Sequence, residues 1–223
     1  AGNIEEWLNV LLEAMRETVR GAVQAAALDC EALDIATFTH KHIAQVSLIG
    51  IQFLWTLDAE EAMFRAKNEK GVMVAAHKKN QARLSDLIAI NLKTDAELRA
   101  HGAWTRRKIE TMILVDVHQR DVFEGLMQQK LRDAASFEWQ KQARFYWSPD
   151  KDAAVVSIAD VDFDYCNEYL GVKERLCITA LTDRCYVTLS QALGMFPGGA
   201  PAGPAGTGKT ETVKALGCTL GKE

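Results

Sequence analysis

The sequence predicts a mainly α-helical bundle followed by the N-terminal part of an α/β module with a phosphate-binding loop (P-loop). Three observations lead to this fold class. Apolar residues recur at helical spacing through most of residues 4–132. The composition changes near Pro149, because no proline precedes it and the other three lie between Pro197 and Pro204. A glycine-rich nucleotide-binding motif then stands close to the last residue, Glu223.

The first part is expected to hold four main helices. Residues 4–28 predict an amphipathic helix, since its apolar side chains recur at spacings of three and four. These side chains are Trp7, Leu8, Leu11, Leu12, Met15 and Val19. Apolar residues surround the next helix, 40–66, which should be largely buried. Two further helices over 70–92 and 95–132, with short connections, complete an antiparallel bundle.

A short fifth helix is expected over residues 137–147, before the pattern changes. Residues 155–165 and 175–179 are rich in β-branched side chains and predict two strands. Residues 182–195 predict a helix whose N-terminus Thr182 or Asp183 could cap. A last helix is expected from Gly208 to Leu220, directly after the glycine-rich loop.

Composition limits the classes of partner. A net charge of −4 gives no overall attraction to nucleic acid or to anionic membranes. The short basic run at residues 106–108 is interpreted as a solvated helix face. Five cysteines without a C-x-x-C pair fit reduced thiols in an intracellular protein. The sequence shows no signal peptide, and no apolar run is long enough to span a bilayer.

Residues 203–210, GPAGTGKT, match the P-loop pattern G-x-x-x-x-G-K-[S/T] at every fixed position. Glycines let the chain turn through positive φ, so that several backbone N–H groups converge on phosphate oxygens. The following helix adds the positive end of its dipole. Lys209 is the catalytic candidate, since its ammonium group can contact the β- and γ-phosphates, and the Thr210 hydroxyl is the candidate Mg²⁺ ligand. The predicted cofactors are therefore ATP or ADP and Mg²⁺.

The motif has two unusual features. The residues before it, 196–202, make a poor strand, although a P-loop normally follows a buried one. Hydrolysis also needs an acidic strand end and often an arginine finger. Only thirteen residues follow Thr210, and Glu211 is the sole acidic residue among them before Glu223. We therefore expect a fragment that is cut inside its nucleotide-binding domain and is inactive alone.

Other polar clusters are interpreted as structural. His40 and His42 are two residues apart and would not share a helix face, so no metal site is expected there. The segment VDVHQRD, 115–121, is interpreted as an exposed charged face. The tryptophan-rich segment from Trp139 to Trp147 is interpreted as packing.

Several segments resemble dynein heavy chains, the motor subunits that move on microtubules. Residues 181–222, LTDRCYVTLSQALGMFPGGAPAGPAGTGKTETVKALGCTLGK, resemble the start of the first AAA+ module of that family. Residues 167–186, NEYLGVKERLCITALTDRCY, resemble the segment that leads into it. Four segments resemble successive helices of the C-terminal half of the dynein linker: EEWLNVLLEAMRETV, VSLIGIQFLWT, KIETMILVDVHQRDV and FEWQKQARFYW. The P-loop region is most similar to outer-arm axonemal chains.

The resemblance implies a division of the chain and a function. Residues 1–164 would be the C-terminal part of the linker, and residues 165–223 the N-terminal part of the first AAA+ ATPase module, truncated after the P-loop helix. ATP binding would be coupled to movement of the linker lever for ciliary or flagellar beating. The nucleotide-binding residues would be Gly203, Pro204, Ala205, Gly206, Thr207, Gly208, Lys209, Thr210 and Glu211, with Leu181 and Thr182 near the adenine.

Two positions depart from the family pattern, which usually has proline at Ala180 and an acidic residue at Ala215. Neither position is expected to touch phosphate. The implied partners are the rest of the heavy chain with its AAA+ ring, other heavy, intermediate and light chains, and microtubules through a distant stalk. Nucleic acid and membranes are not among them. The implied location is the cytoplasm and cytoskeleton, in the axoneme of cilia or flagella.

Two alternatives were weighed against the motor ATPase. The chain could be a structural or interaction segment whose P-loop holds nucleotide without turnover. A small kinase-like P-loop enzyme fits poorly, because the sequence ends too soon after the motif. A lever also needs a firm attachment, so the aromatic side chains near the composition change should be mostly buried. These are Trp139, Tyr146, Trp147, Phe163 and Tyr165.

Overall fold

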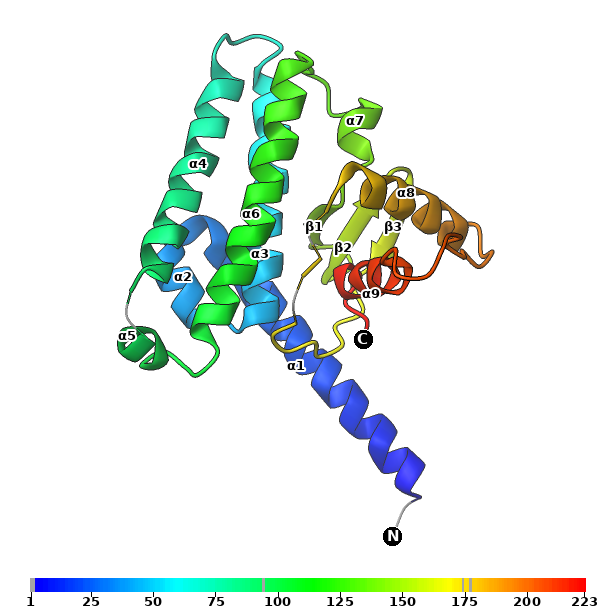
Figure 1. Cartoon of the computed structure of the whole chain (residues 1–223). Helices are drawn as coiled ribbons and strands as arrows, with labels where there is room; N and C mark the ends of the chain where they lie inside the picture. The colour runs from blue at the N-terminus through cyan, green and yellow to red at the C-terminus, as the bar shows by residue number, and fades with distance from the viewer. Residues whose placement is uncertain (1–2, 94, 174, 177) are drawn as a thin grey trace.

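The computed structural model describes residues 3–93, 95–173, 175, 176 and 178–223, except for the side chain of Ala180. A group of long helices stands beside a small sheet, and two C-terminal helices lie on the far side of that sheet (Figure 1). The protein is therefore mainly helical, as the apolar periodicity predicts.

Helix α1 (Ile4–Ala32) packs on the rest of the molecule only through its second half (Figure 1). Val19, Val23, Ala26 and Cys30 are buried at spacings of three and four. The first half extends away from the other elements. Five of the six apolar side chains predicted to share a face are therefore exposed, and Trp7 is the extreme case at 62%.

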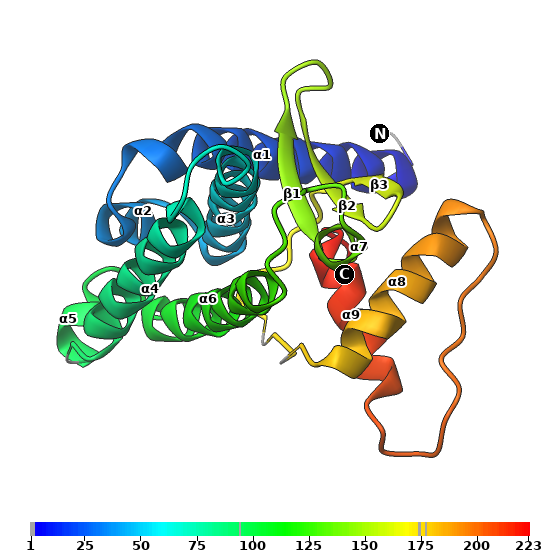
Figure 2. The same ribbon diagram turned by 90° about the horizontal axis from the view of Figure 1, so that it is seen from above.

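The central helix is α3 (Ala44–Arg65), which packs against α1, α4 (Val72–Asn91) and α6 (Thr105–Gln128). Figure 2 shows α3, α4 and α6 side by side. Fourteen of the 22 residues in α3 are buried, including polar Gln45, Ser47 and Thr56, which confirms that this helix is largely buried. A helix that is apolar on all sides has no solvent face to present, so its neighbours must surround it.

Two of the predicted long helices are divided in the structure. The segment 40–66 contains the end of α2 (Ile35–Lys41), and the chain is extended at His42 and Ile43 before α3 begins. Asp34 caps α2 by accepting bonds from the backbone N–H groups of Ala36 and Thr37 at 3.0 Å. The segment 95–132 divides into α5 (Asp95–Arg99) and α6. Gly102, with φ +126°, turns the chain between them.

The prediction of a helix over residues 137–147 was wrong in its second half. Helix α7 covers only Phe137–Gln140, and Arg144–Ser148 form strand β1. The apolar side chains there match a strand as well as a helix. The backbone N–H of Phe145 donates to Thr56 Oγ1 at 3.1 Å on α3, and the Phe145 ring is buried, so tertiary contacts decide between the two.

The segment 155–165 forms two strands rather than one. Strands β2 (Ala153–Ile158) and β3 (Val161–Asp164) pair antiparallel, and the sheet has the order β1-β2-β3. In the register, Phe145 faces Val156, and Val156 faces Phe163. Ala159, with φ +55°, makes the tight reversal between β2 and β3.

Helices α8 (Ala180–Gly194) and α9 (Lys209–Thr219) complete the described chain. The predicted strand at 175–179 is not formed by Arg175, Leu176, Ile178 and Thr179, while Cys177 lies outside the described residues. A strand needs a neighbour to pair with, and the described sheet ends at β3. Thr179 caps α8 instead of Thr182 or Asp183, and Thr182 completes a reciprocal capping box with it.

None of the five junction aromatics is exposed, so they are mostly buried, as predicted. Trp139 and Tyr165 are buried, and Tyr146, Trp147 and Phe163 are half-buried. Trp139 lies 5.0 Å from Trp55 between ring centroids and donates its indole N–H to Glu60 at 3.0 Å, so it belongs to the helical core. Tyr165 instead bridges to α3, because its hydroxyl accepts a bond from Gln45 at 2.8 Å.

Two interpretations of charged segments were wrong in part. Lys108 of the basic run is buried, and its ammonium group donates to the backbone carbonyls of Thr39 and His42. In the segment 115–121, Asp116 is fully buried and pairs with Arg83, whose Nε lies 3.0 Å from Oδ1. Buried charges need partners, and both are supplied by elements far away in sequence.

Candidate nucleotide-binding site

The P-loop lies between α8 and α9, in a long connection that extends away from the sheet (Figure 2). Gly203, Gly206 and Gly208 adopt φ values of +153°, +78° and +77°. L-residues with a side chain rarely adopt such values, so glycine is required at these turns. Residues 203–208 are all exposed, which leaves their backbone N–H groups accessible to a ligand.

Lys209 folds back over the loop that precedes it. Its ammonium group donates to the backbone carbonyl of Pro204 and lies 3.3 Å from Thr207 Oγ1. The Thr207 hydroxyl donates to the same carbonyl at 2.9 Å. The positive charge is thus held against residues 204 and 207 of the loop.

Thr210 and Glu211 occupy the first turn of α9 and are both exposed. The Thr210 hydroxyl is free to reach a ligand in front of the helix, whereas the Glu211 carboxylate pairs with Lys214 at 2.9 Å along the same helix. Thr212 anchors the turn, because its backbone N–H and its hydroxyl both donate to the Gly208 carbonyl, at 2.9 and 3.0 Å. The first turn of α9 is therefore held in place, while Thr210 and Glu211 remain exposed to solvent.

The donor set fits a phosphate group. It combines accessible backbone N–H groups, the N-terminal end of an eleven-residue helix and one ammonium group. A Cβ added at Gly206 or Gly208 would meet nothing within 4 Å, so ligand atoms of that size have room at those turns. Among the described residues, no group of three or more His, Cys, Asp or Glu could hold a metal ion, and Thr210 supplies a single hydroxyl.

Comparison with known proteins identifies the family. A family model described as "Hydrolytic ATP binding site of dynein motor region" matches residues 165–223. The flagellar outer-arm dynein gamma chain of Chlamydomonas reinhardtii is 51% identical over 221 residues. Dynein axonemal heavy chain 5 of Rattus norvegicus and axonemal heavy chain 8 of Homo sapiens are 47% and 46% identical over 223 residues. Each alignment covers 99% of this chain.

The chain belongs to the dynein heavy-chain family. It spans only 5–6% of the length of these three relatives. The dynein resemblance that the sequence motifs suggested is confirmed, as is its likeness to outer-arm chains. None of the described helices of this dynein segment is long and apolar enough to cross a membrane.

Leu181 and Thr182, expected near the adenine, lie in the first turn of α8. Leu181 is 69% exposed, and the hydroxyl of Thr182 is engaged with the Thr179 carbonyl at 2.8 Å. Within the described residues, no hydrogen bond joins either side chain to the P-loop. Their contact with a nucleotide base therefore stays a prediction.

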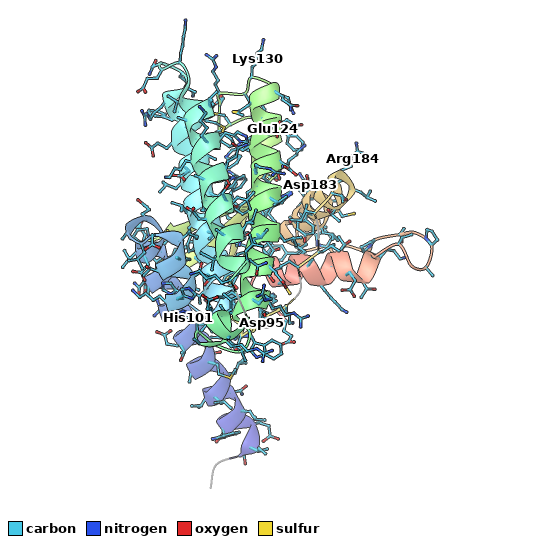
Figure 3. The ribbon with its side chains drawn as sticks, turned by 60° about the vertical axis from the view of Figure 1, so that its left-hand side comes forward. Asp95, His101, Glu124, Lys130, Asp183 and Arg184 are labelled. Carbon is cyan, nitrogen blue, oxygen red and sulfur yellow. The ribbon has the colours of Figure 1, made fainter. Side chains whose placement is uncertain are left out.

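Sequence reasoning missed a cavity between the helical part and α8 that has several polar side chains in its lining. The cavity has a volume of about 150 Å³, and its lining includes His118 and Gln119 of α6, Gln142, and Asp183 and Tyr186 of α8. In Figure 3, Asp183 lies on the side of α8 that is next to α6. Burial raises the pKa of Asp183 and lowers that of His118, and the opposite charge of each partner opposes both shifts.

No short-range pattern could have revealed this cluster. His118 and Asp183 are far apart in sequence, and each looks like an ordinary helix residue. Their meeting depends on how α8 docks on α6, which is a tertiary result. Tyr186 and Thr219 both line this cavity, so it lies where α8 meets the end of α9.

Proposed function

We propose that this chain is the part of a dynein motor ATPase in which Mg²⁺-ATP binds to residues 203–210. The observation that carries the proposal is the loop itself. Three glycines with positive φ expose the backbone in front of α9, and Lys209 is folded over them. The match to a hydrolytic ATP-binding family over residues 165–223 supports the same reading.

Each P-loop residue has a proposed role. The backbone N–H groups of Gly203 and of residues 205–208 bind phosphate oxygens, and Lys209 exchanges its bond to the Pro204 carbonyl for bonds to the β- and γ-phosphates. The Thr210 hydroxyl holds Mg²⁺, which neutralises phosphate charge when it is bound. Glu211 lies beside this position, but its pairing with Lys214 makes it a weak candidate for orienting water.

We propose that residues 1–164 are the linker and residues 165–223 the start of the ATPase module. Contacts across that boundary support a mechanical connection. Arg16 of α1 pairs with Glu168 at 3.1 Å, and Gln45 of α3 donates to the Glu168 carbonyl at 2.8 Å. A change at the nucleotide site could therefore reach the helices through packed, hydrogen-bonded elements rather than a loose tether.

The location follows from the relatives, whose names place them in the flagellar outer arm and the axoneme. The protein is assigned to the cytoskeleton, in the axoneme of cilia or flagella. We propose the rest of the AAA+ ring, the other dynein chains and microtubules as its partners.

Nucleotide binding by the chain tests the central proposal. Lys209→Ala should weaken the affinity for Mg²⁺-ATP by about tenfold or more, because a charge-assisted contact to phosphate is lost. Lys214→Ala, on the same helix but engaged with Glu211, is the matched control and should change the affinity by less than about threefold. Equal affinities for the wild type and the Lys209→Ala variant in isothermal titration would contradict the assignment.

The second candidate, a segment that holds nucleotide without turnover, is tested by hydrolysis. We expect phosphate release by the chain alone to stay at background even where ATP is bound. The reason is that no carboxylate of the described residues stands free beside the loop. Release that depends on Lys209 would show that the chain is a complete ATPase.

A further inference from the structure

A basic pocket lies at the end of the helices opposite the α6–α7 connection. Its volume is about 310 Å³, and it is formed by the end of α2, the turn between α5 and α6, and residues 169–172. In Figure 3, His101 marks this end, while Glu124 and Lys130 mark the other. The pocket is far from the P-loop in sequence and shares none of its residues.

The side chains that line this pocket are basic without acidic neighbours in the lining. His40, Lys41, His42, His101 and Lys108 all contribute to it, and none of its lining residues is Asp or Glu. The imidazole rings of His40 and His101 are stacked with their centroids 3.7 Å apart. Nδ1 of His40 is buried without a hydrogen-bond partner among the described residues. An unpaired buried nitrogen of this kind costs free energy unless a ligand satisfies it.

Three nearby carboxylates are already engaged, and one of them pairs with two bases of the lining. Asp29 accepts from Lys41 and from Nε2 of His42, both at 2.7 Å. Asp34 caps α2, and Asp95 pairs with Arg106 at 2.8 Å. Lys108, which is 8% exposed, reaches only the two backbone carbonyls at the end of α2. An ammonium group has three donors, so one N–H of Lys108 has no partner in these bonds.

The pKa values of the lining residues agree with this shortage of acidic partners. Burial lowers the pKa of Lys108 to about 8, and no carboxylate opposes the shift. Burial also lowers the pKa of His40, and the charges of His101, Lys108 and Lys93 lower it further, with only Asp34 acting against them. Asp29 compensates Lys41 and His42, whereas His40, His101 and Lys108 have no carboxylate beside them in the lining of the pocket.

We propose that this pocket binds a small dianionic oxyanion, namely a phosphate group. His40, His101 and the remaining N–H of Lys108 would donate to its oxygens. A dianion suits three donors in the lining of one pocket better than a carboxylate does, because its three terminal oxygens accept in different directions. The phosphate could be free or carried by an organic group, and the rim favours the second source. Trp104 and Tyr169 line the same pocket and are 63% and 54% exposed, so an organic group has aromatic surface to rest on.

Histidine titration by NMR tests the proposal in the full chain. Lys209→Ala is placed in the background, so that the P-loop competes less strongly for phosphate. Sodium sulfate is the first probe, since it stays a dianion from pH 5 to 9, and sodium chloride at equal ionic strength is the reference. Sulfate should raise the pKa of His40 and His101 and leave that of His77, on α4, unchanged. No selective rise at either pocket histidine would overturn the site.

The affinity for the anion should also rise as pH falls from about 8 to 6. The groups that face the pocket from its own and neighbouring elements are His40, Lys41, His42, Lys93, His101, Lys108, Asp29 and Asp34. Of these, Lys108 gains charge in that range, because burial lowers its pKa to about 8, whereas Asp29 and Asp34 stay ionised because their hydrogen bonds lower the pKa of each. Sulfate binding that is independent of pH would contradict the donor set.

Two variants and two esters complete the test. His101→Gln is at an exposed position and should fold, and it should lower the affinity for inorganic phosphate about tenfold. His77→Gln is the matched control and should leave that affinity unchanged.

Phenyl phosphate should bind more tightly than methyl phosphate, and Trp104→Ala should abolish the difference. Equal binding of both esters would assign the pocket to free phosphate, and equal binding by His101→Gln and wild type would overturn the proposal.

Discussion

At the scale of single residues, Lys108 makes stability depend on pH. Its pKa falls to about 8 in the folded protein, against about 10.4 for an exposed lysine. Between these values the unfolded chain binds more protons than the folded one, so the free energy of unfolding rises with pH. The full effect is about 3 kcal/mol. Lys108→Met should remove this rise, as measured by urea unfolding at pH 7.5 and 10.

The exposed Lys79, which pairs with Asp58 at 2.7 Å, provides the matched control. Lys79→Met should keep the pH dependence of the wild type. If Lys108→Met shows the same increase in stability as the wild type, the buried ammonium group is not its source.

Gln45 is the second residue whose role is decided by burial. It is 2% exposed, and its amide donates to Tyr165 Oη and the Glu168 carbonyl while accepting from the Leu170 N–H, all at 2.8 Å. Gln45→Leu keeps the volume but leaves backbone groups unpaired, so we expect a loss of about 2–4 kcal/mol in chemical unfolding. The half-buried Gln52 bonds only within α3, and Gln52→Leu should cost less than about 1 kcal/mol.

At the scale of elements, α8 ends with an unusual residue. Phe196 has φ +66° and its N–H bonds to the Leu193 carbonyl, a position where helices normally place glycine. The ring is 98% exposed, so little packing offsets the left-handed strain. Phe196→Gly should therefore stabilise the protein by about 0.5–1 kcal/mol in thermal unfolding. Phe196→Ala, which removes the ring but keeps the strained backbone, should leave stability nearly unchanged; an equal gain would assign the effect to the ring.

Local sequence patterns predicted elements well where one face or every face is apolar. The buried helix α3 and the helix after the P-loop are examples. Local patterns failed where a single backbone angle changes the direction of the chain, as at Gly102 and Ala159. The spacing of apolar residues continues through such a turn and does not reveal it. Local patterns also failed at residues 144–148, where hydrogen bonding to Thr56 selects a strand.

The sequence likewise predicted one part of the functional sites and missed another. The P-loop residues are consecutive, so spacing alone identified them, and the structure adds the contacts of Lys209. The cavity around His118 and Asp183 and the basic pocket around His40 and His101 join residues distant in sequence. A single sequence carries no signal for those meetings, because they arise from the docking of separate helices.

At the scale of the whole molecule, one hydrophobic core joins the helical part to the C-terminal segment. It includes Val46 and Ile49 of α3, Val156 of β2, Leu216 of α9, and Leu220 directly after that helix. Backbone bonds reinforce the contact, since Cys166 and Glu168 donate to the carbonyls of Leu220 and Gly221 at 3.0 Å. The two parts should therefore unfold together rather than as independent domains.

Gly221 offers the sharpest test of this coupling. It has φ +75°, and an added Cβ would lie 2.6 Å from the ring of the buried Tyr165, which joins the sheet to α3. Gly221→Ala combines backbone strain with this overlap, so the end of α9 must move away from Tyr165. We expect a loss of about 2–3 kcal/mol and faster hydrogen exchange in α9 than in α3.

Gly217 is the matched control, because it lies within α9 and its added Cβ would meet only the Lys222 carbonyl, at 3.7 Å. Gly217→Ala should be neutral or stabilise the helix by up to about 1 kcal/mol. Tryptophan fluorescence reports on the helical core through Trp55 and Trp139, while hydrogen exchange reports on α9. If the wild type loses α9 well before the fluorescence changes, or if Gly221→Ala matches Gly217→Ala, the attachment of α9 is loose. A loose attachment could not transmit a change at the P-loop to α3, and the proposed lever would need another route.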